Sequence, residues 1–183
     1  MPDRPTPDVL RKLLRYDPAT GKLYWLPRSP DMFLGGEYDP DRRAKGWNTR
    51  LAGQEAFTAT NRGYRVGRIF DAIYQAHRVI WAIVHGQWPA HQIDHIDGDP
   101  SNNRIENLRS CTAIENGHNQ RMPSNNTSGF TGVVLDRGKW VARIKVNRKA
   151  IHLGRFDNFE DAVAARKKAN VAYQFHANHG RRA

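Results

Sequence analysis

Short apolar runs separated by turn signals form the main pattern along the chain. Valine and leucine at helical spacing predict a helix over residues 7–15. A turn follows at Tyr16–Gly21, and a strand is expected from Lys22 to Trp25. Residues 27–50 mix Pro, Gly, Asp and Arg without any period, so we expect a long loop there. Alternation over residues 63–77 predicts a hairpin.

The middle of the chain predicts a strand, loop, strand and helix in succession. The apolar run from His77 to His85 forms a helix that Gly86 ends. Short strands are expected at Gln92–His95 and Leu108–Cys111, with a tight polar loop between them. A capping box over residues 112–115, with Thr at its start and Glu at its end, predicts that another helix begins there.

The last third of the chain predicts a second small fold after a linker at residues 121–128. Three strands are expected at 132–135, 139–146 and 150–153, joined by short turns. Asn158 then caps a helix of roughly residues 159–176. The predicted class is α+β, with one region over residues 1–120 and another over residues 129–183.

Charge is distributed unevenly within the 183 residues, whose net charge is +11. Residues 1–79 hold 14 Lys/Arg against 9 Asp/Glu, or +5, and residues 120–183 hold 13 against 4, or +9. Residues 80–119 hold 2 against 5, or −3. Basic flanks suit a polyanion and an acidic middle suits a cation, so we expect nucleic acid as the partner. A charge that serves solubility or a membrane surface is the alternative.

Cysteine content and hydropathy narrow the class of protein further. Cys111 is the only cysteine, so an intrachain disulfide is impossible and a thiolate zinc site is disfavoured. This fits a reducing compartment, and we expect a cytoplasmic protein, monomeric or weakly dimeric. No apolar run reaches 18 residues and the N-terminus lacks a signal-peptide core, so no membrane association is expected.

Residues Asp94 to Asn116 combine acidic and amide side chains with a histidine. Phosphodiester hydrolysis needs a base for water and a cation for the developing charge, and hard oxygen ligands suit Mg²⁺. Asp94 and His95 are adjacent, so they share a site only if the strand ends or distorts there. One alternative is a turn with its caps. A calcium loop fits poorly, because the acidic spacing lacks the alternating positions and the final glutamate.

Three segments, Ala76–Arg78, Ile93–Gly98 and Asn103–Arg109, resemble the HNH homing-type endonucleases of bacteriophages over roughly residues 60–120. The resemblance implies a ββα-metal fold and assigns roles to individual residues. His95 would be the general base, Asp94 and Asn116 would hold one Mg²⁺ or Mn²⁺ ion, and Asn107 would brace the loop. His77 and His118 are accessory candidates, with a buried hydrogen-bonded imidazole and an exposed one as the simpler interpretations. The cysteine pairs of zinc-bearing members are absent, so no structural zinc is expected.

The C-terminal strands predict a sheet with one apolar and one basic face. Trp140, Ala142 and Ile144 alternate with Val141, Arg143 and Lys145. Segments 128–133, 139–144, 153–156 and 160–162 resemble the Apetala-type (ethylene-response-factor) DNA-binding domain, which implies that the sheet contacts DNA. The residues expected on double-stranded DNA are Lys139, Val141, Arg143, Lys145, His152 and Arg155. Val134 and Asp136 stand where plant members carry arginines, so no plant target sequence is transferred.

These observations predict a phage-type, Mg²⁺-dependent DNA endonuclease, in which an HNH module cuts and a sheet module positions it. One alternative is a sequence-specific DNA-binding regulator with an inactive nuclease module. Another is an RNA-binding protein, because basic charge and aromatic residues do not separate RNA from DNA.

Overall fold

The computed structural model describes residues 4–34, 38–112, 115–116, 119, 122–147, 149–177 and 179–181. The chain forms two compact units, each described here by itself. The first contains residues 1–95 and 99–110, and the second contains residues 96–98 and 111–183. The compact units therefore divide at Cys111, ahead of the predicted linker at 121–128. The functional division of the chain stays a prediction.

The first unit begins with helix α1 (Pro7–Leu13), whose first turn is capped by Thr6, with its Oγ1 accepting the Val9 amide at 3.3 Å. The predicted helix runs two residues too far. Strand β1 (Leu14–Asp17) already starts at Leu14, where it pairs with β2 (Lys22–Trp25). The strand predicted from Lys22 to Trp25 is confirmed, and β3 (Glu55–Ala56) adds to its other edge.

The loop expected over residues 27–50 is wrong, because this segment contains helix α2 (Pro40–Leu51) after a short 3-10 turn, η1 (Pro30–Phe33). Asp39 caps α2 by accepting the Arg42 amide at 3.0 Å. Ala44 is the one buried residue of α2, so the helix has no apolar stripe that could announce it. It is held instead by the Trp47 ring, which meets Trp25 edge-on at 5.8 Å.

The hairpin predicted over residues 63–77 is confirmed as β5 (Tyr64–Ile69) and β6 (Ala72–Gln75). A third strand, β4 (Ala59–Asn61), pairs with β5 and was not expected, since all three of its residues are exposed. Helix α3 (Ala76–His85) follows and ends at Gly86, whose φ is +71°. The core of this unit includes Leu10, Leu23, Ile69, Val79, Ile80 and Ala82.

The two strands predicted in the middle of the chain are confirmed as β7 (Gln92–His95) and β8 (Leu108–Cys111), which form a two-stranded sheet. A 3-10 turn, η2 (Ile105–Asn107), leads into β8. The capping box is also confirmed: Glu115 accepts the Thr112 amide at 2.7 Å, and Thr112 Oγ1 accepts the Glu115 amide at 3.3 Å. Residues 115–116 are helical, and Ala113 and Ile114 lie outside the described residues.

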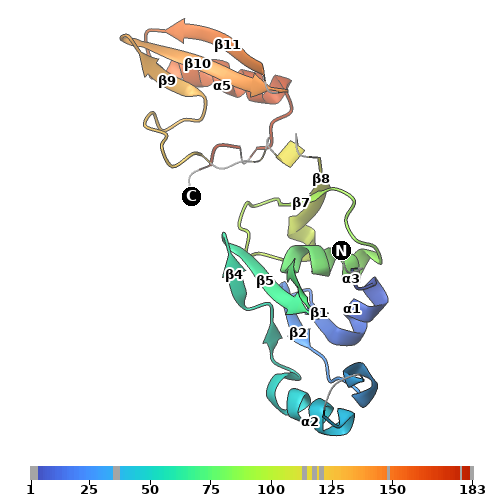
Figure 1. Cartoon of the computed structure of the whole chain (residues 1–183). Coiled ribbons are helices and arrows are strands. Elements are labelled where there is room, and N and C mark those ends of the chain that lie inside the picture. Colours follow the sequence, from blue (N-terminus) through green and yellow to red (C-terminus); the bar gives the residue numbers. More distant parts are fainter. Residues whose placement is uncertain are drawn as a thin grey trace. The chain divides into compact units, whose positions relative to one another are not determined.

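The second unit contains the three predicted C-terminal strands, β9 (Val133–Asp136), β10 (Lys139–Val146) and β11 (Lys149–Phe156), in the antiparallel order β11–β10–β9. Helix α5 (Phe159–Ala172) lies across one face of this sheet (Figure 1). The small core contains the buried side chains Val133, Ala142 and Ala162.

Helix α5 starts where expected, since Asn158 Oδ1 accepts the Asp161 amide at 2.9 Å. It ends at Ala172, four residues before the predicted end. Gln174 has φ +55°, which takes the backbone out of the helix although the apolar pattern continues. None of the helices in the described part of the chain has the length and hydropathy needed to cross a membrane.

The β1–β2 turn supplies a test of the packing. Gly21 has φ +72°, and a Cβ there would lie 2.6 Å from the Arg104 nitrogen and 2.7 Å from the Asn103 carbonyl carbon. Gly53 has φ +80° and open space around it. Gly53→Ala should therefore lower the free energy of unfolding only by the cost of a left-handed backbone, about 1–2 kcal/mol. Gly21→Ala should lower it by roughly 1–3 kcal/mol more, because the backbone of residues 103–104 must move away from the new Cβ.

Urea unfolding followed by tryptophan fluorescence would measure both variants. An equal loss of unfolding free energy in the two would mean that the turn does not pack on residues 103–104 as described.

Candidate functional site

Asp94 lies in the next-to-last position of β7, and its carboxylate is nearly buried at 9% exposure. Arg109, on the paired strand β8, donates to Asp94 Oδ2 from Nε at 3.1 Å and from Nη2 at 2.8 Å. The guanidinium offsets a negative charge that water scarcely reaches. Sequence reasoning missed Arg109 as a site residue, because a single arginine in a strand carries no signal of its partner.

His95 is the last residue of β7 and is 3% exposed. Its ring lies 5.1 Å from the His77 ring, which comes from α3, and 5.8 Å from the Tyr64 ring, which comes from β5. Its Nε2 is 3.0 Å from Asn103 Oδ1. The strand thus ends at the histidine, which is one of the two conditions under which Asp94 and His95 can share a site.

Asn103 is the second residue that sequence reasoning missed as a site residue. It is 3% exposed, although it follows a run of ordinary turn residues. An asparagine in a polar loop is expected to serve the turn, so only its burial against His95 distinguishes it.

The His77 ring packs against Tyr64, 5.3 Å away, and against His95. Burial, together with the smaller effects of the neighbouring His95 and Arg78, lowers the pKa of His77 from 6.5 to about 3. The expected burial is therefore found. The expected hydrogen bond is not found at Nδ1, which has no partner among the described residues. His77 is neutral at physiological pH.

The Asn107 side chain makes a hydrogen bond within the loop, and its bracing role stays a prediction. Its Nδ2 donates to the Asn102 carbonyl at 2.8 Å, and its side chain is 9% exposed. The same stretch is held from outside by Tyr16, whose hydroxyl donates to the Asn103 carbonyl at 3.2 Å and accepts the Ile105 amide at 2.8 Å. The loop is therefore fixed both by its own amides and by the N-terminal hairpin.

The structure brings His95, His77 and Asn103 together, with Asp94 beside Arg109 and Asn107 within the loop. Asn116 belongs to the second unit, and His118 lies outside the described residues. Within the described residues, no three His, Cys, Asp or Glu side chains gather to hold a metal. Asp94 and Asn116 each offer oxygen, which is the donor type that hard cations prefer, and a shared ion stays a prediction.

The six residues predicted to contact DNA lie on the face of the C-terminal sheet opposite Ala142 and Ile144, which are buried. The register pairs Val141 with Arg155 and Arg143 with His152, with an irregularity between Ala142 and Arg143. Two of the six are engaged in ion pairs, Lys139 with Asp157 and Arg155 with Asp136. Arg143 and Lys145 are exposed, and no carboxylate pairs with either within the described part of the chain.

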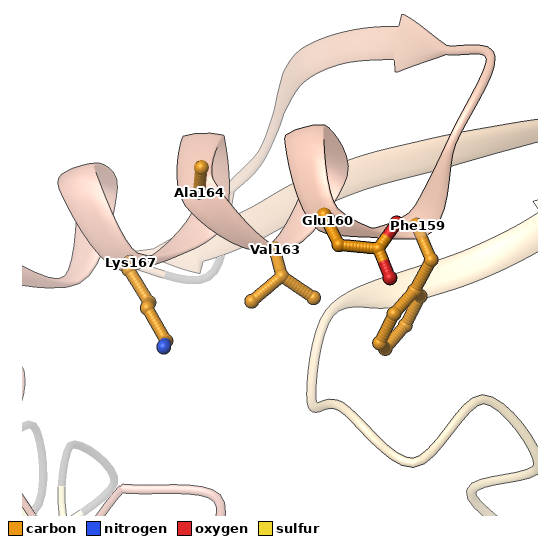
Figure 2. Close-up of a pocket in the computed structure, with 5 residues that line it drawn as sticks. All are labelled: Phe159, Glu160, Val163, Ala164 and Lys167. Carbon is orange, nitrogen blue, oxygen red and sulfur yellow. The ribbon is translucent and has the colours of Figure 1, made fainter.

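A pocket lies on the surface of α5 and contains none of these residues. It is lined by Phe159, Glu160, Val163, Ala164 and Lys167 (Figure 2). The lining combines three apolar side chains with Glu160 and Lys167, and none of the predicted site residues lines it.

Comparison with known proteins identifies the segment that contains β7 and β8. Residues 74–118 match the family described as HNH endonuclease, so the chain contains an HNH endonuclease domain there. The matched span includes Asp94, His95, Asn107 and Asn116. A stretch of 58 residues, 31% of the chain, is 41% identical to Protein 3.8 of Escherichia phage T7. The chain spans about half of that relative, 48% of its length. No solved structure matches the chain significantly.

The low pKa of His77 predicts an acid-dependent stability. The unfolded state binds a proton at this residue below about pH 6.5, whereas the folded state resists it down to about pH 3. The free energy of unfolding should therefore fall as the pH drops through this window, with a slope of at most about 1.4 kcal/mol per pH unit from this group. Above pH 6.5 the group should contribute no pH dependence.

Urea unfolding at pH 7.5 and pH 5 would test this, with His77→Phe as the variant and His91→Phe, at an exposed histidine, as the control. His77→Phe should lose less stability than the wild type between the two pH values, and His91→Phe should match the wild type. Identical losses in all three proteins would contradict the buried neutral state of His77.

Proposed function

We propose that the chain is a metal-dependent DNA endonuclease of the phage homing type, with His95 as its general base. The observation that carries the proposal is the position of the Asp94–His95 pair. It lies at the end of β7, inside the span that matches the HNH endonuclease family. Asn103 contacts the imidazole and Arg109 contacts the carboxylate, so both groups have partners that limit their orientation.

His95 acts on the water that attacks the phosphodiester phosphorus. An imidazole takes and gives a proton near neutral pH, which suits it to remove the proton of this water. The phosphorus–oxygen bond to the leaving sugar breaks, and the released oxygen takes a proton from solvent water. The packing of His95 against His77 and Tyr64 limits ring motion, which favours a fixed direction of proton transfer.

Asp94 and Asn116 would hold one divalent ion, Mg²⁺ or Mn²⁺, within a ββα-metal arrangement. When bound, the ion supplies positive charge to the phosphate oxygens as negative charge develops on them. Asp94 is the only charged ligand of this set, and Arg109 shares its carboxylate. Asn107 keeps the loop between the two strands in place through its bond to the Asn102 carbonyl.

The C-terminal sheet, proposed to be an Apetala-type domain over residues 129–183, would hold double-stranded DNA. Its support is a basic face on a three-stranded sheet that is covered by α5 on the other side. A sheet or ribbon of this size can enter the major groove. Arg143, Lys145 and His152 are the exposed residues that would meet phosphates or base edges first.

His95→Ala should abolish cleavage while DNA binding persists, because the variant loses the base and keeps the basic face. Loss of a general base typically costs about 10²–10⁴-fold in rate. Nicking of supercoiled plasmid DNA with Mg²⁺ or Mn²⁺ measures the rate, and binding is measured in chelator. His91→Ala, at an exposed histidine, is the control and should cut at the wild-type rate. Cleavage by the wild type in excess chelator would rule out the metal, and wild-type turnover in His95→Ala would rule out the base.

Arg143→Ala combined with Lys145→Ala should weaken DNA binding and reduce its dependence on salt. Each phosphate contact that is lost lowers the slope of log K against log salt by about 0.9. Lys167→Ala combined with Lys168→Ala removes the same charge from exposed positions of α5, on the other side of the sheet, and is the matched control. Equal weakening by the two pairs would mean that net charge alone binds DNA and that the sheet face has no special role.

A further inference from the structure

We propose that Asn103 is a positioning residue that fixes the tautomer of His95, so that Nε2 carries the proton and Nδ1 is the atom that accepts one. Tyr16, from the N-terminal hairpin, holds Asn103 in place for this purpose. The assignment of the tautomer stands on contacts alone. Its consequence for catalysis rests on the proposed function of His95 as the general base.

The orientation of the Asn103 amide follows from its two partners. The oxygen and the nitrogen of an amide have nearly the same shape, so hydrogen-bond partners must tell them apart. Asn103 Nδ2 lies 3.3 Å from the Ser101 carbonyl oxygen, which only accepts. The amide oxygen therefore faces His95, where Oδ1 lies 3.0 Å from Nε2.

An amide oxygen only accepts, so Nε2 must be the donor in this bond. A neutral imidazole carries one proton on its two nitrogens, which leaves the lone pair on Nδ1. A half-turn of the ring would bring carbon to the Asn103 oxygen and lose the bond. One contact thus fixes both the protonated nitrogen and the orientation of the ring.

Burial makes this contact difficult to replace by water. Asn103 and His95 are each 3% exposed, and an unmade hydrogen bond between groups so deeply buried is costly. The rings of His77, met edge-on at 5.1 Å, and of Tyr64 close other sides of the imidazole. His95 therefore has few alternatives to the orientation that Asn103 selects.

Tyr16 fixes the backbone from which Asn103 projects. Its hydroxyl donates to the Asn103 carbonyl and accepts the Ile105 amide. One hydroxyl therefore bonds to the backbone of the residues that precede and follow Arg104. Burial raises the pKa of Tyr16 above its usual value, and the hydroxyl therefore remains a donor at neutral pH. Arg104 Nε donates to the Ala19 carbonyl at 2.7 Å, which ties the same backbone to the β1–β2 turn.

Nitrogen-15 NMR of the imidazoles in the full-length protein tests the tautomer directly. In the wild type at pH 7.5, His95 should show a protonated Nε2 whose proton exchanges slowly with water, and an unprotonated Nδ1. Asn103→Leu should lose the slow exchange and populate both tautomers, whereas Asn61→Leu, at an exposed asparagine, should change nothing. A proton on Nδ1 in the wild type would overturn the proposal, and this measurement needs no variant.

Turnover on saturating plasmid DNA tests the consequence. Asn103→Leu should lower kcat by roughly 10–100-fold, as loss of a hydrogen-bond partner that orients a site histidine typically does, with DNA binding unchanged. Asn103→Asp keeps an acceptor for Nε2 and should recover part of the rate, which a purely structural role would not explain. Tyr16→Phe should show a smaller loss of kcat than Asn103→Leu, while Tyr24→Phe on the same hairpin should show none.

The two proposals fail in different ways. If the wild type cuts no DNA with either metal, the proposed function is wrong, and the NMR experiment still decides the tautomer. If the wild type cuts and Asn103→Leu keeps both its rate and its single tautomer, the endonuclease remains and the role of Asn103 is wrong. Should Asn103→Leu not fold, Asn103→Asp decides: loss of the protected Nε2 proton in that variant would overturn the proposal.

Discussion

The docking of the N-terminal hairpin on the loop after β7 is the constraint on which the site depends. The loop residues 99–103 are Asp, Pro, Ser, Asn and Asn, which bury little apolar surface and cannot order themselves by hydrophobic contact. The end of this loop is fixed by Tyr16, which bonds to the backbone of Asn103 and Ile105 and lies 87 residues before Asn103 in the sequence. The absence of a side chain at Gly21 lets the turn approach to backbone contact distance. The loop beside His95 thus takes its rigidity from an element far away in the sequence.

His77 and His95 are buried in one cluster, but the two imidazoles differ in what they contribute to it. His77 remains neutral because desolvation opposes its charged form, so it packs against His95 as a polar aromatic ring and adds no positive charge. The carboxylate of Asp94, the residue next to His95 in the sequence, is offset by its ion pair with Arg109. A neutral ring at this distance, 5.1 Å between ring centres, places no second cation beside the base proposed at His95.

Local signals predicted the elements that carry strong patterns, and tertiary contacts decided the rest. The strands at 92–95 and 108–111, helix α3 and the Thr112–Glu115 capping box were all visible in the sequence. Helix α2 was not, because only Ala44 is buried and its Trp47 contact reaches a distant strand. Asp94 and His95 were predicted as site residues through a family motif. Asn103 and Arg109 were missed, because burial beside His95 and pairing with Asp94 exist only in the folded chain.

The basic sheet face is divided by its own carboxylates. At the end where β10 begins and β11 finishes, Lys139 and Arg155 are paired with Asp157 and Asp136. Toward the opposite end of β10, Arg143 and Lys145 have no such partner in the described structure. A phosphate that approached the first end would have to compete with a carboxylate, and at the second it would not. The field of the sheet is therefore graded along β10, which gives a polyanion a preferred end of the face even before any base is contacted.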